Sequence, residues 1–244
     1  MERLEYEVMA HVEDKLWWYV GMRRIADVWL HSLPITRILD AGCGTGGNAN
    51  WLTNYGQVVG FDYAQMACDY TQQRHIPVAC ASISDMPFRD ASFDLVTSFD
   101  VIYHRAVADD LAALKECYRV LAPGGYCLLR VAAFDWLGGH HHQRVHWARR
   151  YTPTRLRTLM QQAGFTVQKL SCVNTLLLPL VMAQVTKERF TSHATLDHSD
   201  VELPSPIVNR IGLTALACEA MLLRVGVSLP VGVSLLCLAQ RPLD

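Results

Sequence analysis

The chain has 244 residues, of which 51% are apolar and 18% are charged, and its formal net charge is −1. This composition supplies material for a large hydrophobic core and excludes an intrinsically disordered chain. The near-zero net charge argues against a protein that binds nucleic acid by bulk electrostatic attraction. The eight cysteines are scattered and form no C-x-x-C pair, which predicts free thiols in a reducing compartment.

The N-terminal stretch MERLEYEVMAHVEDK is charged and lacks the apolar segment of a secretory signal peptide. No uninterrupted apolar stretch reaches the roughly 20 residues that a membrane-spanning helix needs. We therefore expect a cytoplasmic protein without a spanning segment.

Hydrophobic periodicity and turn residues predict strands that alternate with helices. One or two helices are expected over residues 14–32, before the first strand. The predicted strands are RILDAG (37–42), QVVGFD (57–62), PVACASI (77–83), FDLVTSFDV (93–101), YCLLRVAA (126–133), VQKLSCV (167–173) and VSLLCLAQR (233–241). Helices are predicted between these strands, one beginning at residue 48 and the others over residues 64–74, 108–125 and 152–165. Pro-Gly-Gly is expected to end the helix over residues 108–125.

This alternation predicts right-handed βαβ units and a mostly parallel sheet with helices on both faces. Ligands of such sheets bind beyond the carboxyl ends of the strands. We therefore expect one cleft, formed by the loops that follow residues 40, 61, 81 and 98.

The segment between the sixth and seventh strands, residues 174–230, is unusually long. It contains two apolar helical patterns, 174–190 and 206–227, joined by a polar stretch. One interpretation is a helical extension that packs on the sheet. A second interpretation, compatible with the first, is a hydrophobic cap over the substrate cleft or a contact with a membrane surface.

A glycine-rich turn follows the first strand. Gly42, Gly44 and Gly47 match G-x-G-x-x-G, and Asp62 lies where a dinucleotide site would place its ribose-binding acid. This spacing alone also fits an NAD-dependent oxidoreductase. Asp40, however, lies directly before Ala-Gly, where a carboxylate would repel a pyrophosphate and attract a cationic amine or sulfonium.

Four segments, ILDAGCGTGG, VVGFD, SDMPFRDASFDLV and ECYRVLAPGGYCLL, resemble in order and spacing the motifs of class I S-adenosylmethionine-dependent methyltransferases. The resemblance is strongest to the small-molecule group that includes the ubiquinone and menaquinone biosynthesis methyltransferases, and it covers about residues 36–135. It implies a Rossmann-like, seven-stranded α/β sheet with an antiparallel last strand, to which the chain's own patterns add helices on both faces and an apolar helical insertion before that strand. The single domain would then comprise an N-terminal helical cap (1–34), a cofactor-binding core (35–173), a helical insertion or lid (174–230) and the last strand (231–244).

The resemblance also implies which residues bind S-adenosylmethionine. Asp40 and the glycine turn over residues 42–46 match the motif that holds the methionine portion of the cofactor. Phe99 lies at the loop that lines the same portion. Asp62 matches the acid that binds the ribose, and Tyr63 and Met66 lie where contacts to the adenine face occur. The implied cofactor-binding residues are Asp40, Gly42, Cys43, Gly44, Gly46, Asp62, Tyr63, Met66, Ser82, Ile83 and Phe99.

The chain departs from its relatives at one corner of this site. Where this chain has Ala81, Ser82 and Ile83, relatives often carry Gly-Asp-Ala. In those relatives the aspartate binds the adenine amino group. A serine hydroxyl or the backbone would have to replace that acid. In relatives an N-terminal helix closes over the cofactor, which makes Tyr19 or Arg23 a candidate to contact the cofactor carboxylate.

Methyl transfer requires an aligned, desolvated nucleophile, and a base if that nucleophile is a hydroxyl or an amine. Histidine, with an unperturbed pKa of about 6.5, is the natural base. The candidates are His104, after the fourth strand, and His141 and His146, in the histidine-rich segment after the fifth. His142 and His146 have the i, i+4 spacing of helical zinc sites, but carboxylates are scarce nearby and we predict no metal site.

These inferences predict an enzyme that methylates an oxygen or nitrogen atom, less often carbon, of a lipophilic small molecule in secondary-metabolite or quinone-like biosynthesis. We expect no nucleic-acid partner, and we leave a peripheral membrane contact open. The alternatives are a methyltransferase-like binding protein without turnover, which the Ser82–Ile83 departure favours, and an NAD-dependent oxidoreductase. The oligomeric state is not predicted.

Overall fold

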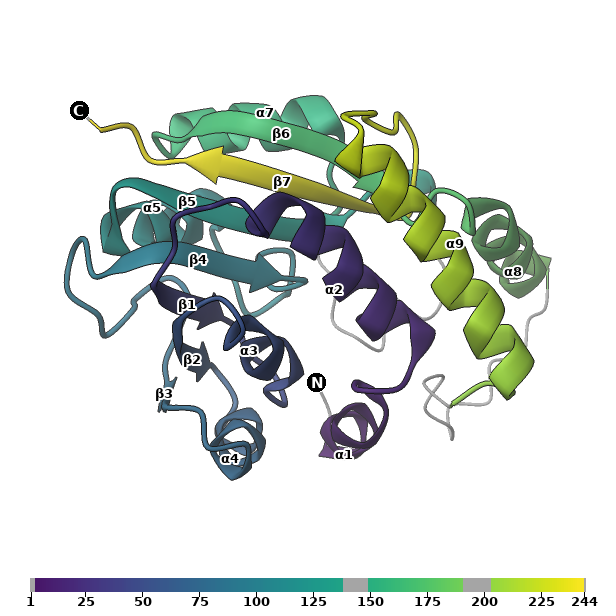
Figure 1. The fold of residues 1–244 in the computed structure, drawn as a ribbon, viewed down its shortest axis with the longest axis horizontal. Helices are drawn as coiled ribbons and strands as arrows, with labels where there is room; N and C mark the ends of the chain where they lie inside the picture. Colours follow the sequence, from purple (N-terminus) through teal and green to yellow (C-terminus); the bar gives the residue numbers. More distant parts are fainter. Residues whose placement is uncertain (1–2, 138–148, 191–202, 244) are drawn as a thin grey trace.

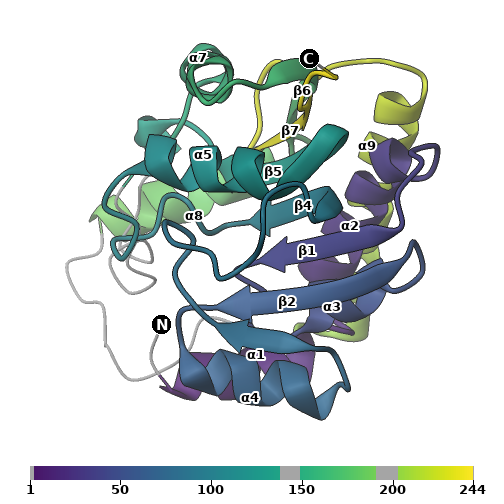
Figure 2. The same cartoon turned by 90° about the vertical axis from the view of Figure 1, so that its left-hand side faces the viewer.

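A computed structural model of the chain describes residues 3–137, 149–190 and 203–243. It contains a seven-stranded sheet of order β3-β2-β1-β4-β5-β7-β6 (Figures 1 and 2). Strand β7 is antiparallel to both its neighbours and the other pairs are parallel. The strands are β1 (Arg37–Ala41), β2 (Gln57–Asp62), β3 (Val78–Cys80), β4 (Phe93–Phe99), β5 (Leu121–Ala132), β6 (Thr166–Val173) and β7 (Ser234–Gln240). The predicted α/β fold with an antiparallel last strand is confirmed.

Helices cover both faces of this sheet. The described helices are α1 (Arg3–Val12), α2 (Trp17–Leu30), α3 (Gly47–Leu52), α4 (Gln65–Gln73), α5 (Asp110–Val120), the 3₁₀ turn η1 (Asp135–Leu137), α7 (Pro153–Gln162), α8 (Leu178–Phe190) and α9 (Pro206–Arg224). Helices α5 and α7 pack on one face, and α2, α3 and α9 pack on the other (Figure 1).

Neighbouring residues of the central strands are buried on opposite faces. In β1, Ile38 belongs to the core under α2 and α9, and Leu39 belongs to the core under α5 and α7; neither has exposed surface. This explains why β1 is a continuous apolar run rather than an alternating one, as expected for a strand covered on both sides.

Helix α5 ends earlier than the sequence predicts. Asp109 caps its start by accepting from the backbone N–H groups of Leu111 and Ala112. At its other end, backbone N–H groups of residues 91 and 92 donate to the last helical carbonyls, and Leu121 already pairs with Phe93 as part of β5. The Pro-Gly-Gly segment therefore lies inside β5, and the prediction that it ends the helix was wrong.

Helix α9 packs closely against α2, because glycines bring the two backbones together. A Cβ on Gly21 would collide with Leu216, and a Cβ on Gly212 would lie 2.5 Å from the ring of Trp17. Glu219, buried in the same helix, accepts from the backbone N–H groups of residues 174 and 176, at 2.7 Å each. The insertion is thus anchored to the N-terminal helices as well as to the end of β6.

We expect Gly212→Ala to lower the free energy of unfolding by ~1–3 kcal/mol, because overpacking against Trp17 outweighs the gain in helix propensity. The urea midpoint of the variant measures this, and Thr214→Ala, at an exposed position of the same helix, is the control. A Gly212→Ala variant more stable than the wild type would show that Trp17 moves aside at little cost.

Candidate functional site

The glycine turn connects β1 to α3 at the carboxyl edge of the sheet. Gly42 and Gly46 have φ values of +79° and +85°, a backbone region that residues with side chains rarely adopt. A Cβ on Gly42 would also collide with Val101, in the loop after β4. The N–H groups of Gly42 and Cys43 donate to the carbonyl oxygen of Phe61 at 2.8 and 2.9 Å. The turn is therefore fixed to the end of β2.

The carboxylate of Asp40 is buried next to this turn, with 1% of the residue exposed. Its Oδ1 accepts a hydrogen bond from Thr97 Oγ1 at 2.7 Å, whereas its Oδ2 has no hydrogen-bond partner among the described residues. Burial raises the pKa of this carboxyl to about 7, and the bond from Thr97 offsets the rise only in part. A buried polar atom without a partner costs ~1–3 kcal/mol, which a cationic ligand group would offset. This geometry fits the predicted contact of Asp40 with the methionine portion.

Asp62 lies at the end of β2 and is bonded to the glycine turn. Its Oδ2 accepts from the N–H of Gly44 at 3.0 Å, and its Oδ1 accepts from the N–H of Ala64 at 2.9 Å. Because each carboxylate oxygen can accept more than one hydrogen bond, both retain capacity for a ribose hydroxyl. Burial raises the pKa of Tyr6, and the nearby negative charge of Asp62 raises it further. Because Tyr6 belongs to α1, this helix lies close to the Asp62 end of the site.

The residues predicted at the adenine corner have different surroundings. Tyr63 is 73% exposed and Met66 is half-buried at the start of α4. Ile83 is buried in the hydrophobic core, and the Ser82 hydroxyl accepts from the N–H of Ser84 at 3.2 Å. In this conformation Ser82 and Ile83 serve the turn and the core, and their contact with adenine stays a prediction.

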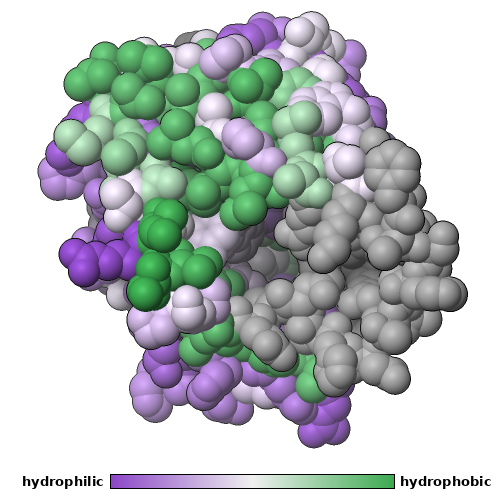
Figure 3. All heavy atoms as spheres, turned by 90° about the vertical axis from the view of Figure 1, so that its right-hand side faces the viewer, coloured by the Kyte–Doolittle hydropathy of each residue, from purple (hydrophilic) through white to green (hydrophobic). Residues whose placement is uncertain are grey.

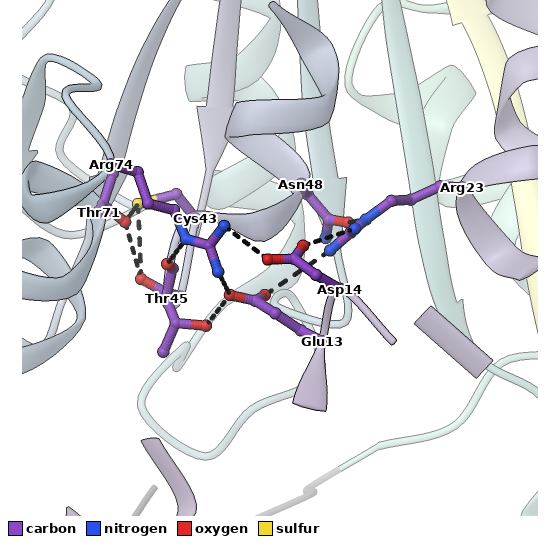
Figure 4. Close-up of polar contacts among 9 residues, drawn as sticks. Glu13, Asp14, Arg23, Cys43, Thr45, Asn48, Thr71 and Arg74 are labelled. Atoms are coloured by element: carbon purple, nitrogen blue, oxygen red, sulfur yellow. Dashed lines mark hydrogen bonds and ion pairs between the residues drawn. The ribbon is translucent and has the colours of Figure 1, made fainter. Parts of the chain in front are cut away.

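Two arginines fasten the connection between α1 and α2 to the glycine turn (Figure 4). Glu13 Oε1 accepts from Thr45 Oγ1 at 2.6 Å and from Arg74 Nη2 at 2.7 Å. Asp14 accepts from Arg74 Nη1 at 2.9 Å and from Arg23 Nη1 at 3.1 Å. Arg74 follows α4 and Arg23 lies in α2, so the network joins the N-terminal helices to the cofactor-binding core. No local pattern in the sequence indicates Glu13, Asp14 and Arg74 as site residues, because their arrangement depends on contacts of Arg74 across 60 or more residues.

Gly47, the third glycine of the sequence pattern, has no side chain, which allows Glu13 and Arg23 to pack against its backbone. A Cβ on Gly47 would collide with Glu13 Oε2 and with Arg23 Nη2. Arg23 Nε donates to Asn48 Oδ1 at 3.1 Å, and Nη2 is buried without a hydrogen-bond partner among the described residues. Nη2 also pairs with Glu13 Oε2 at 3.8 Å, which is too far for a hydrogen bond, so its N–H groups can still donate to a further acceptor, as the predicted contact of Arg23 with a cofactor carboxylate requires.

A partly buried ion pair lies where β4 and β5 end. Arg130 donates from Nε and Nη2 to Asp100 Oδ2 at 2.8 and 2.5 Å. Its guanidinium lies 5.0 Å from the ring centre of Phe99 and 4.7 Å from that of Trp18. Asp100 has a φ of +66°, and such residues cluster at functional sites. In the sequence, the signal for Asp100 is its place directly after the fourth strand, at the edge of the sheet where ligands bind.

His104 lies in the loop after β4. Its Nδ1 accepts from the N–H of Ala106 at 3.1 Å. A neutral imidazole that accepts at Nδ1 carries its proton on Nε2, so His104 in this conformation is a donor at Nε2. Arg149 holds the same loop by donating to the carbonyl oxygens of Val107 and Ala108, at 2.9 and 2.6 Å.

The other two predicted bases, His141 and His146, lie outside the described residues, as does His142 of the zinc-like spacing. Within the described ranges, no three His, Cys, Asp or Glu side chains gather in a way that could hold a metal ion.

The raised pKa of Asp40 has a consequence for stability. Between about pH 4 and pH 7 the folded protein keeps a proton that the unfolded chain releases, so this group lowers stability as the pH rises. We expect Asp40→Asn, without cofactor, to gain ~1–3 kcal/mol relative to wild type between pH 5 and pH 8. Urea unfolding at both pH values measures this, with the exposed Asp69→Asn as control. Parallel pH profiles for Asp40→Asn and wild type would contradict the buried charge.

Known proteins match this chain in sequence and in fold. The family model described as "Methyltransferase domain" matches residues 39–129. A probable S-adenosylmethionine-dependent methyltransferase of Mycolicibacterium smegmatis is 34% identical over 95 residues, which are 38% of this chain and 36% of that protein. A probable tRNA methyltransferase 9B of Bos taurus is 33% identical over 153 residues, which are 60% of this chain and 32% of that protein. The chain thus spans about a third of the length of these two relatives.

A solved structure resembles the whole described fold. It is a chain of the complex between the Haloferax volcanii Trm112 methyltransferase activator and its candidate methyltransferase, with a TM-score of 0.61, 20% identity and coverage of 98% of both chains. At that identity the likeness concerns the fold, and the sequence matches concern the family. The sheet order, the acid and glycine turn at the end of β1 and these matches agree: residues 39–129 match the methyltransferase domain family, and the described chain has the seven-stranded fold of a class I S-adenosylmethionine-dependent methyltransferase.

Proposed function

We propose that this chain transfers the methyl group of S-adenosylmethionine to an oxygen or nitrogen atom, less often carbon, of a lipophilic small molecule. The observation that carries the proposal is the buried Oδ2 of Asp40, which has no partner among the described residues and lies beside a glycine turn that admits no Cβ at Gly42. A dinucleotide pyrophosphate would meet a repulsive carboxylate there, whereas the cationic methionine portion of S-adenosylmethionine would meet an attractive one.

Four side chains would hold the cofactor. Asp40 would attract the positive charge of the methionine portion, and Asp62 would accept hydrogen bonds from the ribose hydroxyls. Arg23 would donate to the methionine carboxylate from Nη2, and Phe99 would line the same portion. When bound, S-adenosylmethionine supplies a methyl group activated by its sulfonium. The chain's own contribution is to align the acceptor, to exclude water and to remove a proton where the acceptor carries one.

The position of α8 supports a lipophilic substrate. Strand β6 runs parallel to β5, so α8 begins at the sheet edge that carries the glycine turn, and Figure 2 shows it on the side toward which the arrowheads of β1 and β2 point. Its first residues, LPLVMA, are apolar. We propose that residues 174–230 form a lid that excludes water over an aromatic, polyketide-like, quinone-like or lipid-tailed acceptor, as in secondary-metabolite or quinone-like biosynthesis.

The similarity to a probable tRNA methyltransferase 9B favours a second candidate, methylation of a transfer RNA. The formal net charge of −1 argues against it, because nucleic-acid binding depends largely on cationic surface. Release of S-adenosylhomocysteine in the presence of unmodified tRNA, compared with a panel of lipophilic phenols and amines, distinguishes the two substrates.

We expect S-adenosylmethionine to stabilise the protein in a thermal-shift titration and NAD to have no effect. Asp62→Ala should weaken cofactor binding by ~1.5–3 kcal/mol, because charge-assisted hydrogen bonds to the ribose are lost. Asp69→Ala, an exposed carboxylate on α4, is the matched control. Because Asp62 also fixes the glycine turn, the melting temperature of each variant without ligand is recorded as well.

Two results would contradict this assignment. Stabilisation by NAD and none by S-adenosylmethionine would favour an oxidoreductase. A folded protein that binds neither ligand would favour a methyltransferase-like binding protein without turnover.

We propose that one of His104, His141 and His146 acts as the base. For His104 this requires that the bond between Nδ1 and the N–H of Ala106 breaks, because Nε2 otherwise carries the proton. Replacement by alanine should lower turnover at least ~10²-fold for at least one of the three, with cofactor affinity unchanged. If all three variants turn over normally with the true acceptor, the reaction proceeds by alignment alone.

A further inference from the structure

The solvent-facing side of α9 exposes large apolar residues in its first and last turns, with Thr214 and Cys218 exposed between them. The exposed apolar residues of α9 and of its C-cap include Ile207, Ile211, Met221 and Val225, which are 73%, 59%, 69% and 75% exposed. Their spacing of 4, 10 and 4 residues places them on one stripe of an α-helix, together with the exposed residues 214, 218 and 222. Figure 3 shows this side of the molecule, where apolar side chains gather over the region of α8 and α9.

The charges of α9 are divided between its two sides. Arg210 and Arg224 are exposed, and they lie about four turns apart on the same flank of the apolar stripe. The helix has one acidic residue, Glu219, which is fully buried on the opposite side, where it accepts backbone hydrogen bonds. The exposed side of α9 is therefore apolar and cationic, with no acidic residue.

Helix α9 is long and apolar enough to cross a membrane by length and composition, with a mean hydropathy of 1.3. Its inner side, however, interlocks with α2 through Gly21 and Gly212 and carries the buried carboxylate of Glu219. To span a bilayer, the helix would have to abandon this packing and bring Glu219 into hydrocarbon, which is strongly unfavourable. Only its outer side is available to a partner.

We propose that the exposed side of α9 docks the folded protein onto a membrane surface that contains anionic phospholipids, with the helix axis parallel to the bilayer. The apolar stripe enters the boundary between headgroups and acyl chains, and the guanidinium groups of Arg210 and Arg224 bind lipid phosphates at its edge. This inference does not depend on the proposed methyltransferase substrate, although a lipid-tailed acceptor would reach the protein from the same surface.

The charges favour this partner over a second copy of the chain. Arg210 and Arg224 lie at nearly equal distances from the middle of the stripe and on one flank. An antiparallel second copy would therefore bring Arg210 close to Arg224 of the other copy, and a parallel copy would still leave the exposed arginines without acidic partners on α9. An anionic lipid surface supplies the opposite charge and the apolar layer together.

Co-sedimentation of the full chain with vesicles tests the proposal. We expect binding to phosphatidylcholine vesicles that contain phosphatidylglycerol, much weaker binding to phosphatidylcholine alone, and a decrease with added salt. Arg210→Gln with Arg224→Gln should lower partitioning onto the anionic vesicles about thirtyfold. Ile211→Asp with Val225→Asp should abolish binding to both kinds of vesicle. Leu243→Asp, at an exposed apolar residue near the C-terminus, is the matched control and should bind like wild type.

Circular dichroism and melting temperatures confirm that each variant is folded, and cofactor binding is measured separately so that the two proposals can fail independently. The proposal is overturned if wild type stays in the supernatant with anionic vesicles, or if both α9 double variants bind as wild type does. It is also overturned if sedimentation velocity shows a dimer that Ile211→Asp with Val225→Asp dissociates while no vesicle binding occurs.

Discussion

Burial of the central strands on both faces is the constraint on which the rest of this structure depends. Ile38 and Leu39 are both fully buried, one under α2 and α9 and the other under α5 and α7. A strand of this kind offers no polar surface along its length, so polar chemistry is confined to its end. Asp40 is an exception, because its polar side chain is buried within β1. One of its carboxylate oxygens accepts a hydrogen bond from Thr97, and the other has no hydrogen-bond partner among the described residues.

The N-terminal helices are joined to the same site by a partly buried charge network. Glu13 and Asp14 bind Arg23 from α2 and Arg74 from the end of α4, and both Glu13 and Arg23 pack against Gly47. Breaking one partner of such a network leaves a buried charge uncompensated, which is strongly destabilising. The network therefore holds helices α1 and α2 against the turn that is proposed to bind the cofactor.

Helix α9 connects this core to the proposed membrane surface. On its inner side, small residues allow close approach to α2, and Glu219 supplies the acceptors for the chain that leaves β6. On its outer side the helix keeps apolar residues and two arginines exposed. One helix thus stabilises the fold with one side and leaves the other for a partner.

The sequence by itself determined the strand order along the chain and the motif at the end of β1, because apolar runs and glycine turns are local patterns. It also placed Asp40 and Asp62 near the ends of β1 and β2, while the antiparallel last strand followed from the family resemblance. Only the tertiary structure decided where α5 ends, since carbonyls at its end are bonded by backbone groups from residues 91 and 92. It alone revealed the pairing of Glu13 with Arg74 and of Asp100 with Arg130, residues that lie 61 and 30 positions apart. Such contacts have no periodicity to read, because they exist only when separate strands and helices meet at one edge of the sheet.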